Sequence, residues 1–430
     1  MFKKVLSLCL AVLMCMTAVV VLSSCSTSGK KGESADILPR NEIKKTDGVT
    51  IPDDFKIGLI TLHDENSTYD KNFIDSFKQV VEALGIKKEN YFIVSNIEES
   101  EQCYNTAVDL AKNKGCKIIF ADSFGHEEYM IQAAKEFPEV EFCHATGTSS
   151  KQINQANFHN AFASIYEGRY LAGIVAGKKL NEMIDAGKIK KEEAVIGYVG
   201  AFTYAEVVSG MTSFFLGARS VCETATMKVR YTGSWYDQAK EQEAATALIE
   251  KDKCVLISQH ADSLGAPTAC EEKGVPNVSY NGSTYNAGKN TWLVSSAINW
   301  APYFQYIIEQ KVQNKAIDTD WTGTIETNSV VLSGLNQGII AEGTQKAIDD
   351  AIKGFKDGTL HVFDTSKFTV GGKKLDVYHA DVNGDFQPDE NVNVIHDGYF
   401  DESNAKDFRS APYFDLIIDG IENMNVNYGD

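Results

Sequence analysis

The sequence lacks the short motifs that mark several common chemistries. It contains no G-x-S-x-G nucleophile elbow, no phosphate-binding loop of the form G-x-x-x-x-G-K followed by Ser or Thr, and no H-E-x-x-H zinc motif. No two cysteines have the C-x-x-C spacing of a zinc ribbon or a thioredoxin-type site. We therefore predict no catalytic residue, no metal ligand and no cofactor, and we expect the protein not to be an enzyme.

Positive charge is scarce as well. Lys and Arg together number 41 against 59 Asp and Glu, which gives a formal net charge of -18 at pH 7. Such a protein is repelled by the phosphates of nucleic acids and by anionic lipids. We therefore expect no nucleic-acid partner and a well-solvated surface.

The N-terminus has the features of a lipoprotein signal peptide. Residues 1–4 are basic, residues 5–21 are almost wholly apolar, and small residues lead to Cys25. The apolar run is too short to indicate a permanent membrane span. We expect residues 1–24 to be removed and Cys25 to carry a lipid, which would anchor the protein on the extracytoplasmic face of the cell membrane. The alternative is an ordinary secretory signal that ends near a cysteine by chance.

The rest of the chain divides into a tether and a large folded part. Residues 25–53 are rich in Ser, Thr, Gly and Lys without a hydrophobic period, which predicts a flexible tether. The remaining length of about 380 residues exceeds one ordinary hydrophobic core, so we expect two lobes.

Apolar strands and amphipathic helices alternate along the chain, for example the strand pattern at 57–62 and the helix pattern that follows it. This alternation predicts the α/β class, with two doubly wound parallel sheets joined by a hinge. Small residues such as Gly173 and Gly177 predict close packing of the helix at 166–180. The expected units are lobe 1 at 54–162 with a return segment at about 297–325, lobe 2 at 163–296 with a return segment at about 326–360, and a C-terminal extension at 361–430.

An aromatic ring stands next to a polar side chain after nearly every predicted strand. Because ligands of open α/β sheets bind beyond the carboxyl ends of the strands, these residues are candidates for a pocket that holds a flat, uncharged ligand. The alternative for each ring is packing within its own loop. The pairs include Tyr69, Ser123, Phe124, Phe202, Trp235, Asp262 and Asn281.

Metal binding is the weaker alternative. The groups at 63–65 and 126–128 contain His and Glu, but adjacent positions suit no common metal site. The run from Asp381 to Asp385 resembles the opening of a calcium loop. Phe386 replaces the usual glycine there, and Val392 stands where a bidentate acid is needed, so we expect a solvated acidic loop.

Several longer motifs together are specific. They are Glu167-Gly168-Arg169-Tyr170-Leu171-Ala172-Gly173, Ile196-Gly197-Tyr198-Val199, Tyr231-Thr232-Gly233-Ser234-Trp235-Tyr236-Asp237 and Gln259-His260-Ala261-Asp262-Ser263. With them, the chain from about Lys56 to about Gly343 resembles the basic membrane protein family of solute-binding lipoproteins of ABC transporters, which includes purine nucleoside receptors. The resemblance implies a type I periplasmic-binding-protein fold without catalysis.

The resemblance also implies roles for the candidate residues. Tyr69, Phe124, Phe202 and Trp235 would stack on a base, and Asp262, Asn281 and Ser123 would bind its edge or a ribose. Two departures matter: Tyr69 follows Ser67-Thr68 where many members have Ser-Phe-Asn, and Asn281 replaces an aspartate that can hold ribose hydroxyls. The choice between nucleoside and free base stays open.

The combined prediction is a membrane-anchored receptor that binds a purine nucleoside or nucleobase between its lobes and delivers it to an ABC permease. One alternative is the same fold with a sugar or another small polar solute, since aromatic rings also stack on sugars. A second alternative is a surface enzyme that acts on nucleosides.

Overall fold

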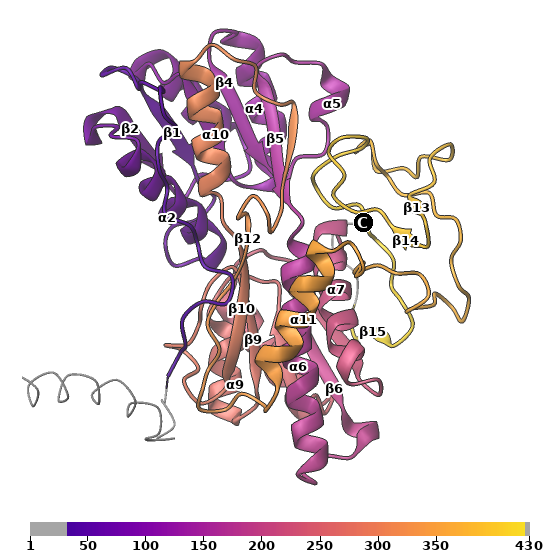
Figure 1. The fold of residues 1–430 in the computed structure, drawn as a ribbon. Helices are drawn as coiled ribbons and strands as arrows, with labels where there is room; N and C mark the ends of the chain where they lie inside the picture. Colours follow the sequence, from indigo (N-terminus) through magenta and orange to yellow (C-terminus); the bar gives the residue numbers. More distant parts are fainter. Residues whose placement is uncertain (1–31, 426–430) are drawn as a thin grey trace, which may run out of the picture.

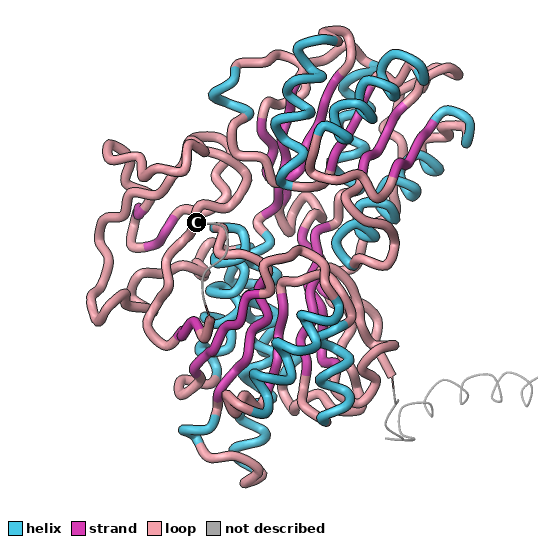
Figure 2. Tube along the Cα trace, turned by 180° about the vertical axis from the view of Figure 1, so that it is seen from behind, coloured by secondary structure: helices cyan, strands magenta, loops and turns pink. Residues whose placement is uncertain are grey.

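In the computed structural model of the protein, residues 32–425 are described; the expected signal peptide and Cys25 lie outside them. The chain forms two α/β lobes, one above the other in Figure 1, with a long C-terminal extension beside them. Seen from behind, the extension again lies alongside the junction of the lobes (Figure 2). The α/β class with two parallel-sheet lobes is thereby confirmed.

Lobe 1 is built on a six-stranded parallel sheet with the order β11-β5-β4-β3-β1-β2. Every residue of β1 and β3 is buried, as expected for strands covered by helices on both faces. The strands are β1 (Ile57–Ile60), β2 (Tyr91–Val94), β3 (Ile118–Ala121), β4 (Glu141–Ala145), β5 (Phe158–Ala163) and β11 (Asp320–Gly323).

The sequence around α2 explains how a lobe 1 helix starts and stops. The Ser67 side chain accepts a hydrogen bond from the Asp70 backbone N–H, Phe73 and Phe77 are buried, and Gly85 follows the last turn with a positive φ of 75°. The lobe 1 helices are α2 (Thr68–Ala83), α3 (Glu101–Val108) with its π-helical continuation η2 (Asp109–Lys114), α4 (Glu127–Glu136), α5 (Ser150–Ile153) and α10 (Ala301–Val312), with 3₁₀ turns η1 (Lys88–Asn90) and η3 (Phe124–His126).

Lobe 2 has a seven-stranded sheet with the order β12-β10-β9-β8-β6-β7-β15, in which only β12 is antiparallel to its neighbour among the described strands. The strands are β6 (Val195–Gly200), β7 (Thr226–Tyr231), β8 (Leu256–Gln259), β9 (Asn277–Tyr280), β10 (Trp292–Ile298), β12 (Val330–Leu332) and β15 (Ile421–Asn423).

Two lobe 2 helices pack backbone against backbone. A Cβ atom on Gly217 would lie 2.0 Å from the Tyr170 carbonyl oxygen, and one on Gly173 would lie 2.0 Å from that of Phe214. The close packing predicted from the small residues is therefore present. The lobe 2 helices are α6 (Ile165–Asp185), α7 (Ala205–Val221), α8 (Gln238–Glu250), α9 (Gly265–Lys273) and α11 (Thr344–Lys356), with the 3₁₀ turn η4 (Lys191–Glu193).

The chain passes between the lobes three times within 57–357. β5 leads into α6, β10 leads back into α10, and β11 leads into β12 (Figure 1). α10 and β11 thus lie in lobe 1, and β12 and α11 in lobe 2. At the crossing, the Asn299 side chain donates to the Asn328 carbonyl oxygen over 2.9 Å, which joins two of the connecting segments.

The expectation of a flexible tether is wrong for residues 33–51. Leu38 forms a β-bridge with Leu332 of β12, and the Thr46 backbone N–H donates to Glu309 Oε1 over 3.0 Å. The Arg40 guanidinium donates to Asn299 Oδ1 over 3.1 Å. The physical reason is that β12 is an edge strand, whose open backbone groups this segment satisfies.

The described part of the extension, residues 361–425, docks mainly on lobe 2. β15 pairs with β7, and the rings of Phe363 and Phe414 stack at 4.3 Å within the lobe 2 core. β13 (Ile395–His396) and β14 (Tyr399–Phe400) form a short hairpin. Near Gly371 and Gly372, a single bridge joins Val370 to Lys373.

The six cysteines of the described residues are all free and buried. Each therefore packs as a small apolar side chain and not as half of a disulfide. Within residues 32–425, no helix combines the length and the apolar character that crossing a bilayer requires.

Candidate functional site

A cavity lies between the lobes, at the carboxyl ends of their strands. It encloses about 340 Å³ of empty space, part of which is open to solvent. This is where open α/β sheets bind ligands. Lobe 1 contributes Leu62, His63, Tyr69, Asp70, Ser123, Phe124 and Thr146, and lobe 2 contributes Glu206, Trp235, His260 and Asp262.

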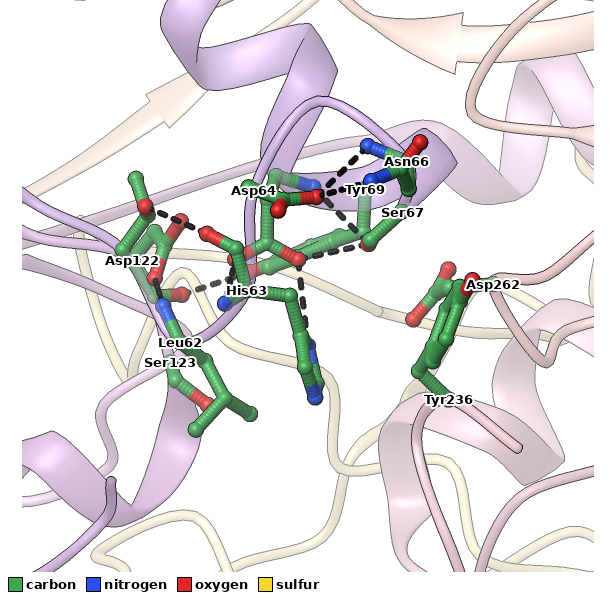
Figure 3. Close-up of polar contacts among 12 residues, drawn as sticks. Leu62, His63, Asp64, Asn66, Ser67, Tyr69, Asp122, Ser123, Tyr236 and Asp262 are labelled. Carbon is green, nitrogen blue, oxygen red and sulfur yellow. Dashed lines mark hydrogen bonds and ion pairs between the residues drawn. The ribbon is translucent and has the colours of Figure 1, made fainter. Parts of the chain in front are cut away.

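The turn after β1, with His63 and Ser67 labelled in Figure 3, donates hydrogen bonds to a buried carboxylate at the start of α2. Asp70 accepts these bonds from the His63 backbone N–H over 2.7 Å and from the Ser67 hydroxyl over 2.5 Å. Burial alone would raise the pKa of Asp70, but the bonds from His63 and Ser67 outweigh it and hold the pKa below its ordinary value. Asp70 also lies 3.4 Å from His63 Nδ1 and thereby fixes the imidazole that faces the cleft.

Asp122, directly after β3, is a carboxyl group whose pKa is shifted upward, opposite to that of Asp70. Its Oδ1 accepts the Leu62 backbone N–H over 3.1 Å, and its Oδ2 has no hydrogen-bond partner. Burial and then the charge of Asp70 raise its pKa well above the ordinary value. Its backbone oxygen accepts the Tyr69 hydroxyl over 2.7 Å, so Asp122 lies behind the Tyr69 ring.

Asp262, after β8, is a buried carboxyl group that lobe 2 contributes to the cavity. Its Oδ1 accepts the Asn281 side-chain N–H over 2.9 Å. Asn281 adopts a left-handed φ of 64°, a conformation that asparagine tolerates better than most residues. Burial, followed by the charges of Asp70 and Glu241, raises the pKa of Asp262 well above its ordinary value. Asp262 therefore holds a proton more readily than a free aspartate and can act as a donor.

Aromatic rings from both lobes meet at one wall, where Phe124 and Trp235 face the cavity. Phe124 of lobe 1 lies 5.2 Å from Tyr204 of lobe 2, centroid to centroid, with an angle of 30° between the rings. Behind them, Phe202 stacks on Tyr204 at 5.3 Å and meets the edge of Trp235 at 4.9 Å. The wall offers ring faces to a flat ligand.

His260 packs on a tyrosine ring that lies next to a buried cation. Its ring lies 5.1 Å from that of Tyr280, and the Arg169 guanidinium lies 4.7 Å from the centre of the same Tyr280 ring. Arg169 is fully buried on α6 and donates to the Tyr198 hydroxyl over 2.9 Å. His260 Nε2 lies 3.7 Å from Glu206 Oε1, which aims the imidazole at the cavity.

Contacts across the cleft hold the lobes together. The Thr68 backbone N–H and hydroxyl, at the start of α2, both donate to the Asp262 carbonyl oxygen, over 3.0 Å and 3.1 Å. The His63 ring lies 5.3 Å from that of Tyr236 (Figure 3). Because these contacts and that of Phe124 with Tyr204 join the two lobes directly, the cleft is closed.

The structure places five of the seven predicted ligand residues on the cavity: Tyr69, Ser123, Phe124, Trp235 and Asp262. Phe202 and Asn281 lie one layer behind. Phe202 supports the rings of Tyr204 and Trp235, and Asn281 holds the Asp262 carboxyl group.

Sequence reasoning assigned no role to several other lining residues. His260 directly follows β8, and His63 lies in the turn after β1, so their position after a strand was the available signal. The only sequence signal for Asp70 is its place in the first turn after the helix N-cap Ser67. The only signal for Glu206 is its place in the first turn of α7. Their orientation depends on contacts between segments far apart in the sequence.

The loop that resembles a calcium site bonds to itself. Asp381 accepts the backbone N–H groups of Gly384 over 2.6 Å and Phe386 over 3.0 Å, and Asp389 accepts that of Val382 over 2.8 Å. In the described part of the chain, no group of three or more His, Cys, Asp or Glu is arranged to hold a metal ion.

Relatives share most of the two-lobed part. A purine-binding protein of Brucella abortus is 30% identical over 314 residues, covering 70% of this chain and 82% of its own. A Haloferax volcanii protein named for glucose binding in an ABC transporter is 34% identical over 207 residues, or 48% of this chain and 49% of its own. A nucleoside-binding protein of a Lactococcus lactis ABC transporter is 25% identical, covering 65% and 70%.

The fold is also shared with a solved structure. A solute-binding protein of an ABC transporter from Conexibacter woesei matches with a TM-score of 0.56 at 20% identity, covering 71% of this chain and 98% of its own. The family described as the PnrA-like substrate-binding proteins of ABC transporters matches residues 57–357. The chain therefore belongs to this Bmp, or PnrA-like, family of extracytoplasmic substrate-binding proteins, with the type I periplasmic-binding fold.

Proposed function

We propose that the cleft binds a purine base or purine nucleoside. The observation that carries this proposal is that aromatic rings of both lobes line the cavity, Tyr69 and Phe124 from lobe 1 and Trp235 from lobe 2. Purines present two flat faces that suit such rings. The purine-binding relative from Brucella abortus supports the same ligand class.

The polar groups suit the edge of a purine. Asp70, with its lowered pKa, is an acceptor, and Asp262, with its raised pKa, can donate. A purine edge alternates hydrogen-bond donors and acceptors, so a pocket that offers both kinds of group pairs them without leaving a buried polar atom unsatisfied.

A thermal-shift panel tests the ligand class. A ligand at about 100 times its Kd stabilises the folded state by roughly 2.7 kcal/mol, which should raise the Tm by a few degrees. Adenosine, guanosine, inosine, adenine and guanine should include at least one stabiliser. Glucose belongs in the panel because a relative is named for it. A shift with glucose and none with any purine would replace the proposal by the sugar-binding alternative.

We further propose that Cys25 carries the lipid anchor and that the closed receptor delivers its ligand to an ABC permease. The basic start, the apolar run and the small residues before Cys25 support the anchor. Cys25→Ala should release the protein from membranes or leave its signal uncleaved. Membrane fractionation with a size comparison checks this, and a variant that stays processed and membrane-bound contradicts the anchor.

A further inference from the structure

A second, larger chamber adjoins the proposed purine site. It encloses about 1420 Å³ of empty space, part of which is open to solvent, and lies where both lobes meet the C-terminal extension. It shares Phe124, Thr146 and Glu206 with the first cavity, so the two are contiguous. The matched family region ends at residue 357, which leaves the extension's part of this chamber outside it.

Aromatic faces and carboxylates dominate this chamber. The Phe386 ring, on the extension, is 66% exposed although it is a large apolar side chain. Phe124 and Tyr204 line the chamber opposite the extension. Glu206, Asp381 and Asp415 supply carboxylates. Rings and carboxylates are the two groups that attract an organic cation.

The cationic side chain that lines this chamber, Arg409, already has partners in the protein. Arg409 is the one Lys or Arg among the described residues that line the chamber. Its Nη1 lies 3.9 Å from Asp381 Oδ2, its Nη2 donates to the Pro412 carbonyl oxygen over 3.1 Å, and its guanidinium lies 5.9 Å from the Tyr413 ring. Glu206 and Asp415 therefore leave the chamber with excess negative charge, which disfavours a phosphate.

The extension is held firmly enough to act as a wall. On lobe 1, Asp320 of β11 accepts the Ser410 backbone N–H over 2.8 Å and the Ser410 hydroxyl over 2.5 Å. The Thr322 hydroxyl donates to the Ser403 carbonyl oxygen over 2.8 Å. On lobe 2, β15 continues the sheet. The chamber is thus closed on three sides by lobe 1, lobe 2 and the extension.

We propose that this chamber binds a cationic, amine-bearing substituent of the purine ligand, and that Phe386 and Asp415 select it. The inference rests on the proposed purine function. The ligand would then be a purine compound larger than a simple nucleoside, with its base in the cleft and its ammonium group between Phe386 and the carboxylates.

Calorimetric titration with matched ligands tests the inference. The probes are adenosine, adenosine with an aminohexyl chain on N6 or at C5′, and the N-acetylated form of each amine, which has nearly the same shape without the charge. At least one amine should bind about tenfold more tightly than its acetylated form. Phe386→Ala and Asp415→Asn should each remove most of that preference and leave adenosine affinity unchanged.

Two controls separate the possible failures. Val377→Ala changes another exposed apolar residue of the extension, 56% exposed, and should keep the preference. If adenosine binds but neither amine is preferred, or if the preference survives in both chamber variants, the chamber inference is wrong and the purine proposal stands. If no purine compound binds, both proposals are wrong.

Discussion

Side chains of one chemical type behave differently in the cleft because their neighbours differ. Asp70 receives hydrogen bonds from His63 and Ser67 and stays ionised, whereas Asp122 and Asp262 are buried near other carboxylates and hold protons more readily. The cleft therefore contains carboxyl groups whose pKa values are shifted in opposite directions, downward at Asp70 and upward at Asp122 and Asp262.

Trp235 should contribute to binding more than to folding, since its ring is half-buried at the cavity and packs on Phe202. Trp235→Ala should weaken purine binding by tenfold or more, because loss of one stacking ring costs about 1–3 kcal/mol. Calorimetric titration measures this. Trp321→Ala is the matched control: Trp321 packs on Tyr303 in lobe 1, so its loss should lower the Tm and leave affinity unchanged. Unchanged affinity in Trp235→Ala would show that its ring only packs within lobe 2.

At the scale of elements, the contact of α6 with α7 depends on glycine. A methyl group at Gly217 would meet the Tyr170 carbonyl oxygen at 2.0 Å, and only a backbone shift relieves that clash. Gly217→Ala should therefore destabilise the protein by about 3 kcal/mol or more. Gly210→Ala, in the same helix, would place its Cβ 3.4 Å from His260 Nδ1 and should be tolerated. Urea unfolding compares them, and equal stabilities would contradict the close packing.

The extension contains a pH-sensitive buried acid. Glu402 accepts the Tyr413 backbone N–H over 3.1 Å, its Oε2 has no partner, and burial raises its pKa to about 8. Because the folded-state pKa exceeds the ordinary 4.5, the folded protein binds the proton more tightly, and stability falls as pH rises from about 5 to 8.

Glu402→Gln, neutral at every pH, should remove the contribution of Glu402 to that fall, which corresponds to a few kcal/mol. Urea unfolding at pH 5 and pH 8 measures the difference. Glu422→Gln, at an exposed position of β15, is the control and should keep the pH dependence of the wild type. Parallel pH profiles of wild type and Glu402→Gln would contradict the prediction.

For the whole molecule, ligand affinity includes the free energy of closing the lobes. The Thr68 hydroxyl donates to the Asp262 carbonyl oxygen over 3.1 Å and so contributes only when the cleft is closed. Thr68→Val should raise Kd about two- to tenfold, the value of one hydrogen bond of about 0.5–1.5 kcal/mol. Thr106→Val, which removes a hydroxyl bonded within α3, should leave Kd unchanged. Titration of both variants checks this, and an equal Kd for Thr68→Val and wild type would rule out the contribution.

The sequence alone determined the fold class and most of the pocket's position. Apolar runs alternating with amphipathic helices specify parallel strands, and parallel strands fix where their carboxyl ends meet. Phe124, Trp235 and Asp262 could be found because each stands just after a strand, and Tyr69 because it lies in the first turn of the helix that follows β1.

Only the tertiary structure decided which side chains face the ligand and which support them. Phe202 and Asn281 occupy the same topological position as their neighbours, yet they pack behind Trp235 and Asp262. Tertiary structure likewise seated residues 33–51 on β12 and brought Phe386 of the extension beside the cleft. The physical reason is that local patterns determine the path of the backbone, whereas edge-strand pairing and side-chain direction depend on partners from other segments of the chain.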